Sequence, residues 1–205
     1  ALQALHPEKL STINHALAAA MGAARLGDGV LVETFLQRAL RLGQAYPRAL
    51  ASALLNAAQI EAGGGRYQAA TAYLEQLVTT LVEISPSAAE EAITLAERAS
   101  EVATGMGDEE LAMKILGEKG LAGKKPPPRY AMLQFRAAHL LIKQGKLEKA
   151  RAIAREALQA SGGQGSEYLS LGDILRMAHD FSGAEDVYRQ GLAQTPQVKG
   201  VSTEL

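Results

Sequence analysis

The chain has 205 residues, of which 47% are apolar and 21% charged, so it is long enough to bury a hydrophobic core. The formal net charge of −1 gives no overall attraction to nucleic acid or to an anionic membrane. Because the chain has no cysteine, disulfides, thiolate metal sites and cysteine nucleophiles are excluded.

Targeting signals are also missing from the sequence. No apolar stretch is long enough for a transmembrane helix, and nothing near the first residue resembles a signal peptide. We therefore expect a cytoplasmic protein that neither inserts into membranes nor binds nucleic acid directly. Removal of a segment before Ala1 is left open.

Helical signals dominate from the first residues to the last. Alanine, leucine, glutamate and lysine are abundant, and no segment alternates polar and apolar residues as a strand does. Pro7, Ser87 and Asp108 are candidate helix starts, with Glu90 placed to complete a capping box with Ser87. The sequence therefore predicts an all-α protein.

Turn residues recur at regular intervals along the chain. Gly27, Gly65, Gly107, Gly145 and His179 stand 34 to 42 residues apart, each between two apolar helical segments. After each turn, small and large apolar residues follow the spacing that two antiparallel helices need to pack closely. The sequence predicts five hairpins, and hence ten helices.

The last two hairpins repeat each other at a spacing of 34 residues. Residues 145–150 correspond to 179–184, and Ala157 and Leu158 correspond to Gly191 and Leu192. Internal repetition at this period indicates a solenoid, in which neighbouring units share a core by stacking.

The repeated residues resemble the tetratricopeptide repeat family. The best matching positions are Tyr168, Leu171, Gly172, Phe181, Ala184, Tyr188, Gly191, Leu192 and Pro196. Hairpins one to three depart more, with longer helices and with Ala20, Ala58 and Ser100 where the family has glycine. The resemblance implies a right-handed superhelical solenoid whose first helices line a concave groove for peptides or protein segments.

We expect three long hairpins in residues 1–123, two regular hairpins in 124–196 that continue the first part, and a tail at 197–205. Between the two parts, the three consecutive prolines at 126–128 favour a stiff extended connection. A hinge or an exposed proline ligand is the alternative interpretation of that segment.

If the repeats align with the family, one set of residues faces the concave side and is the predicted partner-binding groove. It comprises Asn14, Leu17, Met21, Leu55, Gln59, Glu97, Glu101, Phe135, His139, Asp173 and Arg176. For Met21 and Phe135 a place in the core is an equal alternative. Family members that capture chaperone tails use lysines, asparagines and an arginine; only Asn56 and Arg98 fit that pattern here, which disfavours such a clamp.

Charges are segregated along the chain. Residues 83–110 contain eight acidic residues and one arginine, whereas residues 124–155 contain nine basic residues and one glutamate. Attraction between neighbouring hairpins is one interpretation, and it would contribute little for exposed pairs. A dipolar groove that orients a partner is the other.

The two ends of the predicted solenoid differ. Residues 16–24 are apolar on nearly every side of their helix, which predicts a cover: a missing segment, a partner, or a second copy of the chain in a homo-oligomer. The last helix is expected to present polar residues outward and to turn Phe181 and Leu192 inward, as a terminal repeat requires.

Catalytic chemistry is poorly supported. The four histidines are scattered over different hairpins without an acid partner at metal-ligand or triad spacing, so we expect no enzyme, metal or cofactor. The leading hypothesis is a noncatalytic scaffold or adaptor, of the assembly-factor or chaperone type, that binds a peptide or helix in its groove. The alternative is a sensor or regulatory domain of a larger signalling or transcription protein.

Overall fold

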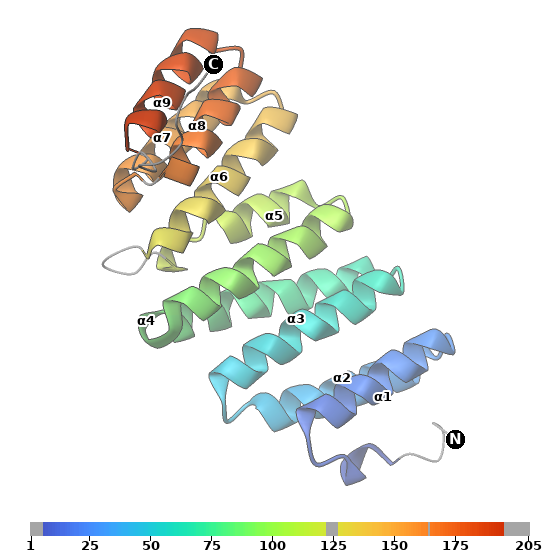
Figure 1. Cartoon of the computed structure of the whole chain (residues 1–205). Coiled ribbons are helices and arrows are strands. Elements are labelled where there is room, and N and C mark those ends of the chain that lie inside the picture. The colour runs from blue at the N-terminus through green and yellow to red at the C-terminus, as the bar shows by residue number, and fades with distance from the viewer. Residues whose placement is uncertain (1–5, 122–126, 164, 195–205) are drawn as a thin grey trace, which may run out of the picture. The chain divides into compact units, whose positions relative to one another are not determined.

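The computed structural model describes residues 6–121, 127–163 and 165–194 (Figure 1). Every regular element in these ranges is helical, and the helices form stacked hairpins. Their contacts divide the chain into two compact units, Ala1–Lys125 and Pro126–Leu205. The predicted all-α helical solenoid is confirmed, while the right-handed sense of the superhelix stays a prediction. The tail at 197–205 and Pro126, the first of the three consecutive prolines, lie outside the described residues.

Hairpin one pairs helix α1 (Ile13–Arg25) with helix α2 (Gly29–Gly43). Thr12 caps α1, since its hydroxyl accepts from the His15 amide at 3.2 Å. Asp28 caps α2 through the Leu31 amide at 3.0 Å. The short 3-10 helix η2 (Pro7–Lys9) precedes them. The predicted helix start at Pro7 is thus only a 3-10 turn.

Hairpins two and three share one long helix. Helix α3 (Pro47–Gly63) packs on α4 (Tyr67–Gly105), which then pairs with α5 (Glu109–Leu116) and the 3-10 helix η3 (Lys119–Leu121). Helix α4 contains a single break at Ala88, so residues before it belong to hairpin two and residues after it to hairpin three. Nine α-helices among the described residues therefore supply the ten predicted segments.

The break in α4 corrects one predicted cap and the start of α5 confirms another. Pro86 removes a helical donor just before the break at Ala88. Ser87 does not form the expected capping box, because its hydroxyl donates back to the Ile84 carbonyl at 3.1 Å. Asp108 does cap α5, accepting from the Leu111 amide at 2.9 Å.

The second unit consists of hairpins four and five. Helix α6 (Pro128–Lys143) pairs with α7 (Leu147–Ser161), and α8 (Gly165–Met177) pairs with α9 (Phe181–Gln194). Helix α8 also packs on both α6 and α7. Stacking therefore joins hairpin five to hairpin four through its first helix.

The five turn residues aligned from the sequence share one backbone conformation. Gly27, Gly65, Gly107, Gly145 and His179 all have positive φ, between 61° and 79°. This left-handed conformation suits glycine, and His179 adopts it with a side chain that lies edge-on to Phe181, ring centroids 6.1 Å apart. The predicted equivalence of the turns is confirmed.

Close approach of the paired helices depends on small residues. In hairpin five, a Cβ at Gly172 would lie 2.2 Å from a Tyr188 ring carbon, and one at Gly191 would lie 2.7 Å from the Tyr168 Cβ. Each tyrosine therefore packs over a glycine of the opposite helix. In hairpin four, Ala138 and Ala154 take the places of Gly172 and Tyr188 and are fully buried.

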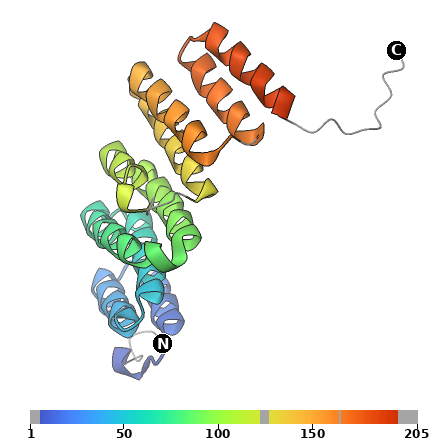
Figure 2. The same ribbon diagram turned by 90° about the vertical axis from the view of Figure 1, so that its left-hand side faces the viewer.

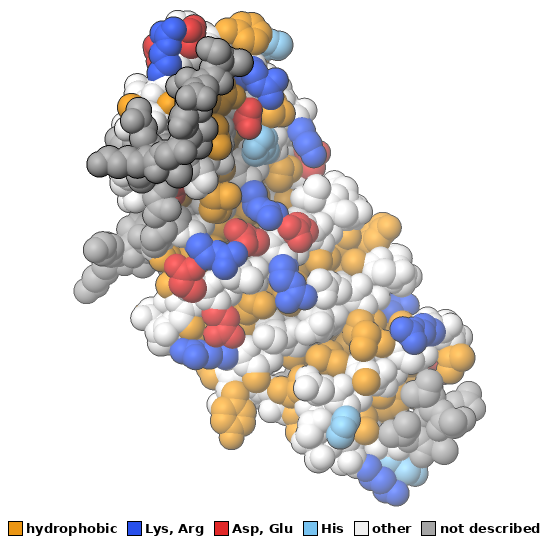
Figure 3. Space-filling view, in the orientation of Figure 1, with side chains coloured by type: hydrophobic (Ala, Val, Ile, Leu, Met, Phe, Trp, Pro, Cys, Tyr) orange, Lys and Arg blue, Asp and Glu red, His pale blue; other side chains and the backbone are white. Residues whose placement is uncertain are grey.

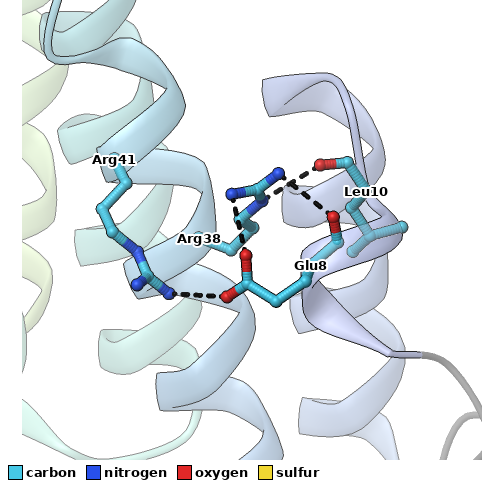
Figure 4. A network of polar contacts seen from close by, with 4 residues as sticks. All are labelled: Glu8, Leu10, Arg38 and Arg41. Atoms are coloured by element: carbon cyan, nitrogen blue, oxygen red, sulfur yellow. Dashed lines mark hydrogen bonds and ion pairs between the residues drawn. The ribbon is translucent and has the colours of Figure 1, made fainter.

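Arg38 of α2 fixes the segment before α1 (Figure 4). Its guanidinium donates to the Leu10 carbonyl at 3.0 Å, to the Glu8 carboxylate at 3.2 Å and to the Glu8 carbonyl at 3.3 Å. Arg41 adds a longer contact of 3.5 Å to the same carboxylate. Two backbone carbonyls of the segment before α1 are thereby satisfied by a side chain of the hairpin.

A buried ion pair stabilises the turn of hairpin two. The Glu61 carboxylate, in the last turn of α3, is almost completely buried and accepts from the Nε of Arg66. The Arg66 amide donates to the Glu61 carbonyl at 2.9 Å. Nearby, the buried Tyr73 hydroxyl donates to Glu33 at 3.1 Å; burial, and then the charge of Glu33, raises the pKa of Tyr73 above its ordinary value of 10.0.

We expect Glu61→Ala to destabilise the fold, because Arg66 would be left without its charge partner. Loss of one member of a fully buried pair costs about 3 to 5 kcal/mol, and the partial exposure of Arg66 lowers the expected cost to about 2 kcal/mol. Urea denaturation followed by circular dichroism measures the change. Glu75→Ala is the matched control, because Glu75 and its partner Lys114 are exposed and should contribute less than about 1 kcal/mol. Equal effects of the two changes would contradict this account.

Candidate functional site

The first helices of the three hairpins in the first unit form one face. Helices α1, α3 and residues 89–105 of α4 lie side by side, and α2, residues 67–87 and α5 form the layer behind them (Figures 1 and 2). We call the surface made by the first three elements the first-helix face. Alanines buried on the inner sides of these helices hold the two layers close together.

The larger hollow on this face lies between α1 and α3 and has a volume of about 470 Å³. We call it the α1–α3 hollow. Its lining is mostly apolar, with polar groups from two amide side chains and one arginine: Met21, Ala24, Arg25, Asn56, Gln59, Ile60, Gly63 and Gly64. Met21 is 47% exposed and can contact a ligand directly. The Asn56 amide donates to the Ser52 carbonyl at 2.7 Å, which fixes its orientation.

A second hollow of about 280 Å³, the α3–α4 hollow, continues the first. Its lining is Gln59, Ala62, Tyr67, Val102, Gly105 and Met106. Gln59 belongs to both hollows and therefore joins them. Hydrophobic side chains gather over α1 and α3 on the side of the molecule shown in Figure 3.

The helix ends set the electrostatics of this face. Helices α1, α3 and α4 end at Arg25, Gly63 and Gly105. Arg25 and Gly63 line the α1–α3 hollow, and Gly105 lines the α3–α4 hollow. The C-terminal end of a helix carries a partial negative charge, although backbone amides of the following turn bind several carbonyls of each last turn here. Arg25 supplies a positive charge at the rim. The face thus combines apolar hollows with hydrogen-bond donors and acceptors, which suits an amphipathic ligand.

Two predicted groove residues line the hollows, and three others are on the helices that form this face. Met21 and Gln59 line the hollows, and Glu101 is exposed on α4 directly before the lining residue Val102. Glu97 is half-buried one turn earlier, and Asn14 is exposed in the first turn of α1.

Three other predicted residues lie in the core. Leu17, Leu55 and Phe135 are buried, so they offer no surface to a ligand, and the expectation that they line an open groove is corrected. Leu17 is buried because α2 and α3 both pack on α1. For Phe135, the core alternative considered from the sequence is the correct one.

The remaining predicted residues come together in the second unit. The Asp173 carboxylate on α8 accepts from the Tyr188 hydroxyl at 2.9 Å and from Arg176 at 3.4 Å. His139 on α6 is half-buried and interacts electrostatically with Asp173. Burial is the main cause that lowers the pKa of His139 below 6.5; the Asp173 charge opposes this shift and Lys143 adds to it.

Sequence reasoning missed the residues that complete the hollows. Ala24, Arg25, Ile60 and Val102 stand in the last turns of their helices, close to the hairpin turns. Ala24 follows Met21 by three residues and Gly63 follows Gln59 by four, so helical spacing places each on the same helix face as the predicted residue. The sequence therefore contained a signal for these two lining positions. Met106 lies beyond the regular helix and gave no such signal.

Both expectations about the ends of the solenoid need correction. Ala16, Ala19, Ala20 and Ala23 are buried by the helices of their own unit, so the chain itself provides most of the predicted cover for α1. On α9, the expected inward residues Phe181 and Leu192 are exposed, at 64% and 76%.

Two further features bear on the functional classes. Within the described residues, no cluster of three or more histidine, aspartate or glutamate side chains could hold a metal ion. Of the helices in the same ranges, none combines the length and apolar character needed to cross a bilayer.

We expect the NMR titration of His139 in the folded chain to have a midpoint below 6.5, since burial disfavours its charged form. Its contribution to stability should be present above pH 6.5 and decline as the pH falls through the folded-state pKa. Asp173→Asn should lower the midpoint further and Lys143→Gln should raise it. A midpoint at or above 6.5 in the wild-type chain would contradict the described burial.

No protein-family model and no curated protein sequence matches this chain. Several solved structures do match it. The MamA protein is 14% identical, with 95% of this chain and 98% of that chain covered and a TM-score of 0.53. BtubC (BKLC) from P. vanneervenii is 18% identical, with 88% of this chain and 78% of that chain covered and a TM-score of 0.51.

A third solved structure shares an explicit repeat description. The putative kinesin light chain of Podosopora anserina, with nearly identical TPR-like repeats, is 13% identical, with 92% of this chain and 95% of that chain covered and a TM-score of 0.52. At these identities the likeness concerns the fold. The chain has the fold of tetratricopeptide repeat proteins, as its repeated residues predict.

Proposed function

We propose that this chain is a noncatalytic scaffold that binds a peptide or amphipathic helix of a partner protein on the first-helix face. One observation carries the proposal: two hollows, joined at Gln59, run across α1, α3 and α4. A segment lying across these helices would place one apolar side chain in each hollow. Burial of such a side chain contributes about 1.5 to 3 kcal/mol.

The fold supports the same role. Solenoids of stacked hairpins present extended surfaces that bind other proteins, because their repeats continue along one direction. The amide groups of Asn56 and Gln59 can exchange hydrogen bonds with a partner backbone, whereas the apolar lining gives affinity. An adaptor with an assembly or chaperone role is the form of scaffold that we propose.

A sensor domain that binds a small effector is the second candidate. It is favoured by the size of the α1–α3 hollow, since about 470 Å³ falls within the range of small-molecule sites. In that case a small molecule, and not a polypeptide, would occupy the space beside Met21 and Asn56.

Self-association through α1 is a further proposal on partners. Met21 and Ala18 are exposed on α1, while Leu17 is buried within the unit. The apolar area left for a second copy is therefore small, and a dimer formed there would be weak.

A photoreactive phenylalanine analogue at position 21 should cross-link to a partner polypeptide, because Met21 lines the α1–α3 hollow and is exposed. The same analogue at Tyr46, which is 68% exposed and lies between α2 and α3, is the matched control. Mass spectrometry of captured peptides from the native host extract identifies the product.

We expect discrete partner peptides at position 21 and none at position 46. The double variant Glu97→Lys and Glu101→Lys should capture fewer partner peptides at position 21 if these acidic residues of α4 contact the partner. Equal capture at both positions, or capture of the chain by itself alone, would contradict the scaffold proposal. If no partner peptide is cross-linked and native mass spectrometry shows a metabolite bound to the chain, the result would favour the sensor domain.

A further inference from the structure

The turn of hairpin four carries three exposed lysines between residues 143 and 149. Lys143 is the last residue of α6, Lys146 precedes α7 at its N-cap, and Lys149 lies in the first turn of α7. The Lys146 amide donates to the Leu141 carbonyl at 2.8 Å, so the chain reverses tightly and the three lysines lie at the same end of the hairpin. We call them the turn-four lysines.

The charges of the turn-four lysines are not compensated. Among the described residues, none of the three contacts a carboxylate. The Lys146 ammonium donates to the neutral amide of Gln144 at 2.8 Å. The arginines of α7 differ, because Arg151 and Arg155 each pair with a carboxylate, at 2.9 Å and 3.3 Å. The positive charge of hairpin four is therefore paired along α7 and left open at the turn.

The other hairpins show that the turn itself does not need these charges. Counted from the aligned turn residue, the same positions hold an arginine and an aspartate in hairpin one, and a single aspartate in hairpins three and five. In hairpin two they hold Arg66, which is paired with the buried Glu61. All five turns nevertheless have the same positive φ. An uncompensated excess of positive charge is thus particular to hairpin four.

Lys146 also stands where an acidic residue would stabilise the helix. Asp28, Asp108 and Asp180 occupy this position in three other hairpins, and each accepts from the backbone amide three residues further on. Lys146 makes no such bond. Because positive charges in the first turn also oppose the helix dipole, the turn-four lysines do not favour the stability of α7. Residues that break a local rule in this way are expected at functional positions.

The size of the lysine cluster indicates the kind of partner. Proteins that bind duplex DNA commonly neutralise about six to ten phosphates, and segments that bind anionic membranes have about four to eight bases. The turn-four lysines fall below both ranges. Glu148, which is 85% exposed, stands between two of them, and residues 165–194 of the same unit contain five acidic residues and two arginines. A continuous anionic surface would meet these carboxylates, whereas a short acidic segment can avoid them.

We infer that the turn-four lysines bind an acidic segment of a partner protein, whose carboxylates contact the three ammonium groups. Each contact between exposed charges is weak, so the binding depends on several lysines together and falls as salt is added. This surface lies in the second unit and includes no residue of the first-helix face. The inference therefore goes beyond the proposed function and does not depend on it.

His139 provides a reporter of this binding. It lies on α6 one helical turn before Lys143. Burial is the main cause of its lowered pKa, the Asp173 carboxylate of α8 opposes the shift, and the charge of Lys143 adds to it. Carboxylates bound to Lys143 offset that charge and therefore raise the pKa of His139. An acidic ligand bound in the other unit has no such effect.

A short acidic peptide tests the inference. The probe is acetylated and amidated Gly-Asp-Glu-Glu-Asp-Gly, and the same peptide with Asn and Gln in place of its acids is the neutral counterpart. Amide chemical shifts of the isotope-labelled full chain measure binding at neutral pH and low salt. We expect saturable binding of the acidic peptide alone, and a higher titration midpoint of His139 in the complex. The affinity should fall about tenfold or more when Lys143→Gln, Lys146→Gln and Lys149→Gln are combined.

The matched control combines Lys9→Gln, Arg98→Gln and Lys114→Gln, which remove the same amount of charge from exposed residues of the first unit. This control should leave the affinity unchanged. Unchanged circular dichroism of both triple variants excludes unfolding as the cause.

Four outcomes would overturn the inference. The first is absence of saturable binding of the acidic peptide, and the second is binding that leaves the midpoint of His139 unchanged. The third is an equal loss of affinity in the two triple variants. The fourth is binding of a DNA duplex or of phosphatidylserine vesicles that depends on the turn-four lysines and is tighter than that of the peptide. This last result would assign the surface to nucleic acid or to a membrane.

Discussion

Close approach of two antiparallel helices is the constraint on which this structure depends. At Gly172 and Gly191 the space of a missing side chain is taken by a tyrosine ring of the opposite helix. In the other hairpins, fully buried alanines such as Ala20, Ala58 and Ala138 serve the same purpose. Large side chains at these places would separate the helices, and the next hairpin would lose the surface on which it stacks.

Stacking in turn creates the surface that we propose to bind a partner. Because each first helix packs on the hairpin before it, α1, α3 and the later part of α4 lie in one layer, with hollows between their last turns. The same repetition leaves an uncovered position on α8 and α9, where no described helix follows. The proposed surface of the first unit is therefore a consequence of this packing rule.

The turns and the helix pairs could be predicted because their signals are local. Gly145 and His179 mark turns through backbone conformation, and the 34-residue period relates the hairpins to each other. The continuity of α4 was not predictable, since Pro86 and Ser87 resemble the end of one helix and the cap of another. Burial of Leu55 was missed because it depends on the packing of neighbouring hairpins, which periodicity within a single helix does not report.

The most direct test of the packing rule is the unfolding free energy of Gly172→Ala, measured against Gly105→Ala. A Cβ at Gly172 would lie 2.2 Å from the Tyr188 ring, whereas one at Gly105, the last residue of α4, meets nothing within 4 Å. The account predicts that Gly172→Ala lowers stability by about 1 to 3 kcal/mol and that Gly105→Ala does not. Equal stability of the two variants would contradict it.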